Sequence, residues 1–239
     1  MWVVKLGGSL VRNGRLRPWI EALTGQDRSE RPPLAPNLVI VPGGGPFADR
    51  VREMQATLEF DEPTAHGMAV LAMEQYGLML AGLSPRLVPV SSKAALLKTA
   101  RRGDIPLWMP SRMVIGRGDI PALWEVTSDS LAAWLAGYLK ATCLILVKSV
   151  DPLVDDPVSD TPQQEEQPTV TLSALQERGV IDRAFGKFAS CGGVEVRCPG
   201  PADLAGFPAA LGRGVAPGLW VALAGSPCPG SASRPNTET

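Results

Sequence analysis

One lysine, two glycines and a serine at the end of an apolar run form the first pattern with chemical meaning. The apolar run 1–6 contains Lys5 near its end and is followed by Gly7, Gly8 and Ser9. Glycine lacks a Cβ, so backbone N–H groups in such a loop can approach an anion closely, and the lysine adds a positive charge. The pattern predicts a phosphate-binding loop, although a tight strand-to-helix turn uses the same residue types.

A second glycine loop repeats this design after the apolar run 37–41. Gly43, Gly44 and Gly45 precede Pro46, a residue suited to the first turn of a helix. A helix that begins there presents unpaired N–H groups and the positive end of its dipole to phosphate oxygens. Two such loops at successive strand ends favour an anion site over two plain turns.

The glycine loops can be compared with two known nucleotide-binding patterns, the dinucleotide-binding pattern and the Walker pattern. The second loop also fits the Gly-x-Gly-x-x-Ala spacing of dinucleotide-binding modules, ending at Ala48. About 20 residues further on, however, the acidic residues lie in a polar turn near Pro63 and not at a strand end. The Walker pattern G-x-x-x-x-G-K-[ST] does not occur in the sequence. A dinucleotide module is therefore a minor alternative.

Two further polar positions have both a structural and a chemical interpretation. Ser128 and Asp129 belong to TSDS at 127–130, which reads as a helix N-cap with an acidic first turn. Lys187 is a lone lysine among small and aromatic residues, as on a helix that directs its ammonium to solvent.

The histidine and cysteine content excludes several kinds of chemistry. His66 is the single histidine, so neither a zinc site with several imidazoles nor a histidine-led catalytic triad is available. The four cysteines form no C-x-x-C pair, which favours reduced thiols. We expect no metal site built from protein side chains.

Composition and charge limit the partners. The chain has 239 residues, with 23 Lys and Arg against 24 Asp and Glu, a net charge of −1 that disfavours nucleic acid. Residues 1–5 show no secretory signal, and the most apolar stretch, 131–147, is short and contains Lys140. We therefore expect a cytoplasmic protein without a membrane segment.

The order of elements predicts an α/β fold, because strand-like and helix-like segments alternate along the chain. Strands are expected at 1–6, 37–41, 87–90, 105–109, 142–147, 194–197 and 219–223. Helices are expected at 18–23, 47–58, 65–83, 94–101, 127–139, 172–178, 183–190 and 201–211. This order predicts a mainly parallel sheet with helices on both faces and ligands at the carboxyl ends of its strands.

Domain boundaries follow from the same pattern. Residues 1–224 are expected to form one domain, 225–239 a disordered tail, and 155–168 an acidic surface loop. The helix at 65–83 is apolar nearly all round and should be buried. We expect a homo-oligomer that buries this helix, although a helix buried within a monomer would have the same apolar sequence pattern.

Five motifs in this order resemble the amino acid kinase superfamily over about 220 residues: KLGGSL at 5–10, VPGGGPFAD at 41–49, TSDS at 127–130, LVKSVD at 146–151 and the lysine at 187. Within it, HGMA at 66–69 and W-x-x-TSDSL at 124–131 are most similar to the kinases of methanofuran biosynthesis. The resemblance implies a three-layer αβα sandwich in which the N-terminal half binds the acceptor and the C-terminal half binds ATP.

The resemblance also implies roles for individual residues. Lys5 and Lys187 match the two catalytic lysines, and Asp129 matches the acidic residue that orients them. The phosphate and acceptor loops are matched by Gly7, Gly8, Ser9, Gly43, Gly44, Gly45 and Ser128. The nucleotide segment is matched by Lys148, Ser149 and Asp151, and possible substrate contacts are His66 and Trp124.

The implied reaction is ATP-dependent phosphorylation of a small phosphorylated acceptor, with Mg²⁺ on the donor phosphates. The most similar kinases convert an aminomethylfuran-methyl phosphate to its diphosphate. Phosphoryl transfer depends mainly on positioning and charge stabilisation, so a chain with one histidine is suited to it. A carboxylate kinase for an amino acid is an alternative. Pro152 stands where the nucleotide segment usually has glycine, which keeps a non-catalytic nucleotide-binding relative open as another.

Overall fold

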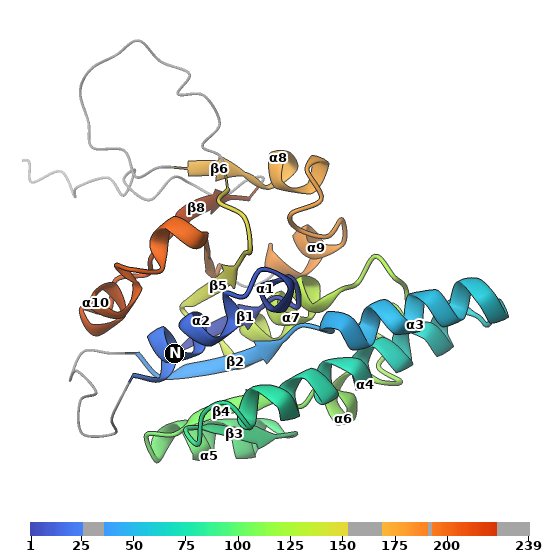
Figure 1. Cartoon of the computed structure of the whole chain (residues 1–239), viewed down its shortest axis with the longest axis horizontal. Coiled ribbons are helices and arrows are strands. Elements are labelled where there is room, and N and C mark those ends of the chain that lie inside the picture. The colour runs from blue at the N-terminus through green and yellow to red at the C-terminus, as the bar shows by residue number, and fades with distance from the viewer. Residues whose placement is uncertain (26–35, 153–168, 191–192, 224–239) are drawn as a thin grey trace, which may run out of the picture.

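A computed structural model describes residues 1–25, 36–152, 169–190 and 193–223 of the chain (Figure 1). The expected tail 225–239 and the expected surface loop 155–168 lie outside the described residues. Within them, Cys143 and Cys198 are free and buried. Cys191 and Cys228 lie outside the described residues, and the reduced state of all four thiols stays a prediction.

The described residues form one eight-stranded sheet. Its strands are β1 (Trp2–Leu6), β2 (Leu38–Pro42), β3 (Leu87–Val90), β4 (Ile105–Trp108), β5 (Cys143–Val147), β6 (Thr169–Thr171), β7 (Glu195–Cys198) and β8 (Leu219–Ala222). The strand order is β3-β4-β2-β1-β5-β7-β8-β6, and every neighbouring pair is parallel except β7 and β8. The predicted α/β fold with a mainly parallel sheet is confirmed.

The described helices are α1 (Ser9–Arg12), α2 (Leu16–Thr24), α3 (Gly45–Leu58), α4 (Glu62–Ala81), α5 (Lys93–Arg101), α6 (Ser111–Val114), α7 (Ser128–Leu139), α8 (Leu172–Glu177), α9 (Phe185–Ala189) and α10 (Phe207–Gly212), with a short 3₁₀ turn η2 (Pro201–Asp203). The sequence pattern missed α1 and α6, which have four residues each and are too short to show a helical period, and the three-residue strand β6. The structure starts α4 at Glu62, three residues before the predicted start, because Asp61 accepts a hydrogen bond from the Thr64 amide and caps the helix.

Helices cover both faces of the sheet, which gives the three layers implied by the resemblance (Figure 1). Side chains alternate along β1, so Val3 packs in one core cluster with α7 and Val4 in the other. The second cluster includes Trp19 of α2 and Phe207 of α10, whose rings meet edge to face with centroids 5.0 Å apart. Strands β1, β2 and β5 are buried along their whole length, as expected for strands covered on both faces.

The helix α4 differs from its prediction. Tyr76 and Leu80 are fully buried, but Met68, Leu71 and Leu78 are exposed on the surface of the chain. The helix is therefore not buried all round within one chain, and the homo-oligomer stays a prediction. No helix among the described residues is long and apolar enough to cross a membrane.

The two glycine loops pack backbone against backbone at the carboxyl ends of β1 and β2. These strands are parallel neighbours with Leu6 opposite Pro42, and the Gly43 amide donates to the Leu6 carbonyl at 2.8 Å. A Cβ on Gly8 would lie 2.1 Å from the Cα of Gly45, and Gly45 has a φ of +56°. Only glycine permits this approach, so the contact explains the glycines at both positions.

Replacing Gly8 with alanine is expected to separate the two loops, because the new methyl group would overlap the Gly45 backbone. We expect a loss of about 1–3 kcal/mol in the free energy of unfolding, measured by urea denaturation. The matched control is Gly67→Ala in α4, where an added Cβ meets nothing within 4 Å. The control should be neutral or stabilising. Equal stability of the two variants would contradict the predicted contact.

Candidate active site

Two lysines and one aspartate meet on the α7 side of the sheet. Strands β1 and β5 are parallel neighbours with Leu6 opposite Val147, so Lys5 near the end of β1 and Lys148 just after β5 lie side by side. Asp129 is the second residue of α7. Its Oδ1 lies 2.9 Å from the Lys5 Nζ, and its Oδ2 accepts a 2.9 Å hydrogen bond from the Lys148 Nζ.

All three groups are removed from solvent. Lys5 is 7% exposed, Lys148 7% and Asp129 5%. The Lys148 ammonium also donates to the Val180 carbonyl at 2.5 Å, and Lys5 forms an ion pair with Asp129. Two ammonium groups share the Asp129 carboxylate in a desolvated place, and the carboxylate of Asp182 also acts on Lys5. In such a place an ammonium group interacts strongly with any anion that reaches it.

The ionisation of the triad follows from its burial and its partners. Burial alone would raise the pKa of Asp129, but the charges of Lys148 and Lys5 outweigh it and lower that pKa to about 2. Burial lowers the pKa of Lys5 despite the opposing effect of Asp129. Asp129 is therefore ionised at neutral pH and holds the two ammonium groups on opposite oxygens.

The glycine loops lie directly beside this triad. A Cβ on Gly7 would lie 3.3 Å from the Lys5 Nζ, so the ammonium sits against the first loop. The Gly7 carbonyl accepts a hydrogen bond from the buried Tyr76 hydroxyl at 3.2 Å, which anchors that loop to α4. No side chain caps the N-terminus of α1 or α3. The Leu10, Val11 and Ala48 amides already donate to backbone carbonyls, so the amides that open the two helices, those of Ser9 and Gly45, are the donors proposed for an anion.

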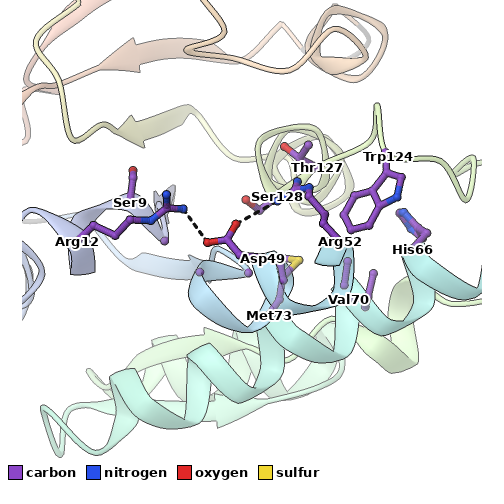
Figure 2. Close-up of a pocket in the computed structure, with 15 residues that line it drawn as sticks. Ser9, Arg12, Asp49, Arg52, His66, Val70, Met73, Trp124, Thr127 and Ser128 are labelled. Carbon is purple, nitrogen blue, oxygen red and sulfur yellow. Dashed lines mark hydrogen bonds and ion pairs between the residues drawn. The ribbon is translucent and has the colours of Figure 1, made fainter. Parts of the chain in front are cut away.

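A pocket of about 210 Å³ opens over these loops. Figure 2 shows Ser9 and Arg12 at one side, Ser128 near the middle, and His66 with Trp124 at the other side. It is lined by Gly8, Ser9, Arg12, Gly44, Gly45, Ala48, Asp49, Arg52, His66, Ala69, Val70, Met73, Trp124, Thr127 and Ser128. The pocket thus joins backbone amides at one end to an aromatic and imidazole wall at the other.

Charged side chains at the pocket form a network that sequence reasoning missed. Asp49 accepts from Arg12 at 2.7 Å and from Arg52 at 3.3 Å (Figure 2). The Arg52 guanidinium lies 4.5 Å from the centroid of the Trp124 ring, and the Trp124 indole donates to Gln55. These contacts hold the wall that carries Trp124 against α3. No motif identified these two arginines. Arg12 reaches Asp49 only through the packing of α1 beside α3, whereas Arg52 is three residues from Asp49 on α3, a spacing common to exposed helical ion pairs.

His66 presents one ring nitrogen for a ligand. Its Nδ1 lies 3.2 Å from the Leu123 carbonyl, and because a carbonyl only accepts, Nδ1 carries the proton and donates. Burial lowers the pKa of His66, so the ring is neutral at pH 7 and its Nε2 is an acceptor. Among the described residues, Nε2 forms no hydrogen bond, and the side chain lines the pocket.

The structure places the predicted acceptor residues close together. Gly8, Ser9, Ser128, His66 and Trp124 line the pocket together with Gly44 and Gly45, while Gly7 and Gly43 lie behind them in the same two loops. Their roles toward a ligand remain predictions.

The predicted nucleotide segment lies beyond β5, away from this pocket. The Ser149 carbonyl accepts from Asn13 at 3.3 Å, and the exposed Asp151 accepts from the Ala202 amide at 2.8 Å. Lys148 differs from both, because its side chain turns inward to Asp129. The segment therefore contributes one group to the triad.

One predicted pairing needs correction. The sequence motifs paired Asp129 with Lys5 and Lys187, but its two oxygens contact Lys5 and Lys148. Lys187 is exposed on α9 and lines a different pocket, of about 460 Å³, with Trp134 and Tyr138 of α7. Chain order could not separate the two lysines, because only the register of β5 beside β1 brings Lys148 to the first loop. A catalytic role for Lys187 stays a prediction.

The described residues do not build a metal site of their own. They contain no group of three or more His, Cys, Asp or Glu side chains placed to hold an ion. Asp129, the buried carboxylate of the site, is already bound by two ammonium groups.

Comparisons with known proteins identify the family of this chain. The family model "Amino acid kinase family" matches residues 1–192, and the chain belongs to this family. A curated relative, the [5-(aminomethyl)furan-3-yl]methyl phosphate kinase of Methanocaldococcus jannaschii, is 26% identical over 155 residues, 65% of this chain and 68% of that protein. The prediction of a small-molecule kinase of this family is confirmed.

Solved structures with the same fold include two kinases. Uridylate kinase from Archaeoglobus fulgidus has a TM-score of 0.64 at 19% identity, covering 92% of this chain and 99% of that one. Isopentenyl phosphate kinase from T. acidophilum has a TM-score of 0.55 at 15% identity, covering 93% of this chain and 100% of that one. At these identities the likeness concerns the fold.

Replacing Asp129 with asparagine is expected to destabilise the protein, because two buried ammonium groups lose their counter-charge. Breaking a buried ion pair by removing one partner costs about 3–5 kcal/mol, measurable by urea denaturation at pH 7. Asp119→Asn, which alters an exposed ion pair with Arg117, should have a small effect.

The pH dependence follows from the same carboxylate. Its pKa of about 2 lies below the ordinary 3.8, so its contribution is complete above the ordinary value and is lost as the pH falls toward 2. The wild type should lose more stability than Asp129→Asn between pH 4 and 2. Parallel stability curves for the two proteins would contradict this assignment.

Proposed function

We propose that this chain transfers the γ-phosphoryl group of ATP to the phosphate of a small phosphomonoester. The proposed acceptor is [5-(aminomethyl)furan-3-yl]methyl phosphate, the compound named for the curated relative, and the product is its diphosphate. The observation that carries the proposal is the pair of buried ammonium groups on one carboxylate, beside a pocket with open backbone amides.

The proposed step conserves atoms and charge without a protein base. An ionised oxygen of the acceptor phosphate forms a bond to the γ-phosphorus, and the bond from that phosphorus to the β,γ-bridging oxygen breaks. ADP leaves with the electron pair. Because both reactants are anions, the main obstacle is their repulsion, which Lys5 and Lys148 offset by stabilising charge on the transferred group.

ATP and Mg²⁺ are proposed to arrive together. Mg²⁺ usually binds through substrate phosphates and water and needs few protein ligands, in keeping with the absence of a carboxylate cluster among the described residues. Bound to ATP, the ion neutralises part of the donor charge. Lys148, Ser149 and Asp151, at the end of β5, are the residues proposed on the nucleotide side.

The acceptor is proposed to lie with its phosphate toward the glycine loops and its ring toward Trp124. The amides of Ser9 and Ser128 begin α1 and α7 at the phosphate end. At the other end, the Nε2 of His66 accepts a hydrogen bond from the aminomethyl group. A pocket of about 210 Å³ is below the roughly 300–1,000 Å³ of drug-sized ligand sites, which favours one small ring over a whole nucleotide.

Product formation tests the proposed activity directly. With ATP and Mg²⁺, the purified protein is expected to release ADP with the aminomethylfuran phosphate faster than with uridylate or isopentenyl phosphate. The product should be a diphosphate that is stable to hydroxylamine. An acyl phosphate formed from acetylglutamate, which reacts with hydroxylamine, would instead indicate a carboxylate kinase. ATP binding without ADP release for every acceptor would indicate a non-catalytic relative.

A comparison of two lysine variants tests which ammonium acts with Lys5. Lys148→Met is expected to lower kcat by about 10²–10³-fold, the usual loss for one buried charge-stabilising donor. Lys187→Met should lower it much less, because Lys187 is exposed and lies at the other pocket. The measurement is coupled ADP release at saturating substrates, with circular dichroism to verify folding. The reverse order of effects would assign the second ammonium to Lys187.

A further inference from the structure

Asp182, between α8 and α9, binds the first turn of α7 through four hydrogen bonds. Its Oδ2 accepts from the Thr127 amide at 3.2 Å, the Thr127 hydroxyl at 2.6 Å and the Ser130 amide at 3.0 Å. Its Oδ1 accepts from the Ser130 hydroxyl at 2.5 Å. A carboxylate that accepts four bonds from one helix turn fixes both the position and the rotation of that turn.

The two residues bound by Asp182 come directly before and directly after two residues of the site. Thr127 and Ser130 enclose Ser128, which lines the acceptor pocket, and Asp129, which pairs with the two lysines. Ser130 is fully buried, so its hydroxyl has no access to solvent. Any shift of this turn therefore moves the carboxylate of Asp129 relative to both ammonium groups.

The same short segment also holds the second lysine. Val180, two residues before Asp182, accepts a hydrogen bond from the Lys148 ammonium through its carbonyl. The side-chain amide of Gln176 in α8 donates to the Asp182 backbone carbonyl at 2.9 Å, which ties the segment to α8. One rigid segment, 180–182, thus contacts both partners of the Lys148–Asp129 bond.

Asp182 also determines which amides of the turn remain for a ligand. The amides of Thr127 and Ser130 bind Asp182, and the Asp129 amide donates to the Thr127 hydroxyl oxygen at 3.3 Å. Among the described residues, the Ser128 amide has no such partner, and Ser128 lines the acceptor pocket. We call the four hydrogen bonds of Asp182 to this turn the Asp182 clamp. The clamp leaves the Ser128 amide as a first-turn donor beside the pocket where the acceptor phosphate is proposed to bind.

We propose that Asp182 is a positioning residue for phosphoryl transfer. It sets the distance between Asp129 and the two ammonium groups, and it acts through α7 without touching the substrate. This inference rests on the proposed function for its kinetic consequences, whereas the clamp itself can be tested by a measurement that needs no activity. A displacement of about 1 Å in a catalytic group costs on the order of 10²-fold in rate. Loss of the clamp should therefore lower kcat measurably.

Two substitutions separate hydrogen bonding from charge. Asp182→Ala removes all four bonds. Asp182→Asn keeps an oxygen for the three donors at the Oδ2 position, and its amide can donate to the Ser130 hydroxyl, whose hydrogen rotates away. The control is Ser92→Ala, which removes a helix cap from α5, a helix that contributes no residue to the acceptor pocket.

Hydrogen exchange and kinetics are then measured on the full chain. In Asp182→Ala, the amides of residues 127–131 should exchange faster, and kcat should fall by about 10²-fold with KM for ATP changed less than threefold. Asp182→Asn should restore the protection and most of kcat. Ser92→Ala should match the wild type in both measurements. If Asp182→Ala does not fold, Ser130→Ala, which removes one of the four bonds, carries the same two measurements.

The outcomes distinguish this inference from the proposed function. If no protein, the wild type included, turns over any acceptor, the proposed function fails, while unchanged protection of 127–131 in Asp182→Ala would separately overturn the clamp. Wild-type kcat in Asp182→Ala would overturn the positioning role. Loss of kcat in Asp182→Asn with full protection would also overturn it, because the charge of Asp182 would then be the cause.

Discussion

The site depends on one interaction, the sharing of the Asp129 carboxylate by two buried ammonium groups. Neither lysine is stable as a buried cation alone, and the carboxylate alone would be protonated by burial. Together they hold the end of β1, the end of β5 and the start of α7 in one place. The same two ammonium groups are the ones proposed to stabilise an anionic substrate, so one interaction serves the fold and the proposed chemistry.

Backbone geometry complements that charge. The loops after β1 and β2 contact each other through glycine atoms, and Gly7 of the first loop lies against the ammonium of Lys5. The backbone amides of such loops are fixed by the fold and do not need to reorganise when charge develops on a transferred phosphoryl group. Around them, α4 contributes Tyr76 below the loop and His66 at the far wall of the pocket.

Much of this was accessible from residue types and their order. The alternation of strands and helices predicted the parallel sheet, and the glycine loops, Lys5 and Asp129 were identified because their local patterns are specific. Asp182 had no such signal, since a single aspartate before a short helix looks like any surface acid. Lys148 was assigned to the nucleotide segment, and its bond to Asp129 was missed. The exposure of Met68, Leu71 and Leu78 on α4 was not predicted, because helical periodicity gives no information about which neighbours cover an apolar helix.

The class of fold and the kind of chemistry follow from short-range sequence patterns: a lysine before glycines, a polar cap before a helix, and apolar runs of strand length. The lysine that completes the triad and the residue that holds α7 follow instead from three-dimensional packing. The register of β5 against β1 brings Lys148 beside Lys5 across a separation of 143 residues. Such a contact is set by sheet pairing and core packing, which local sequence patterns do not record.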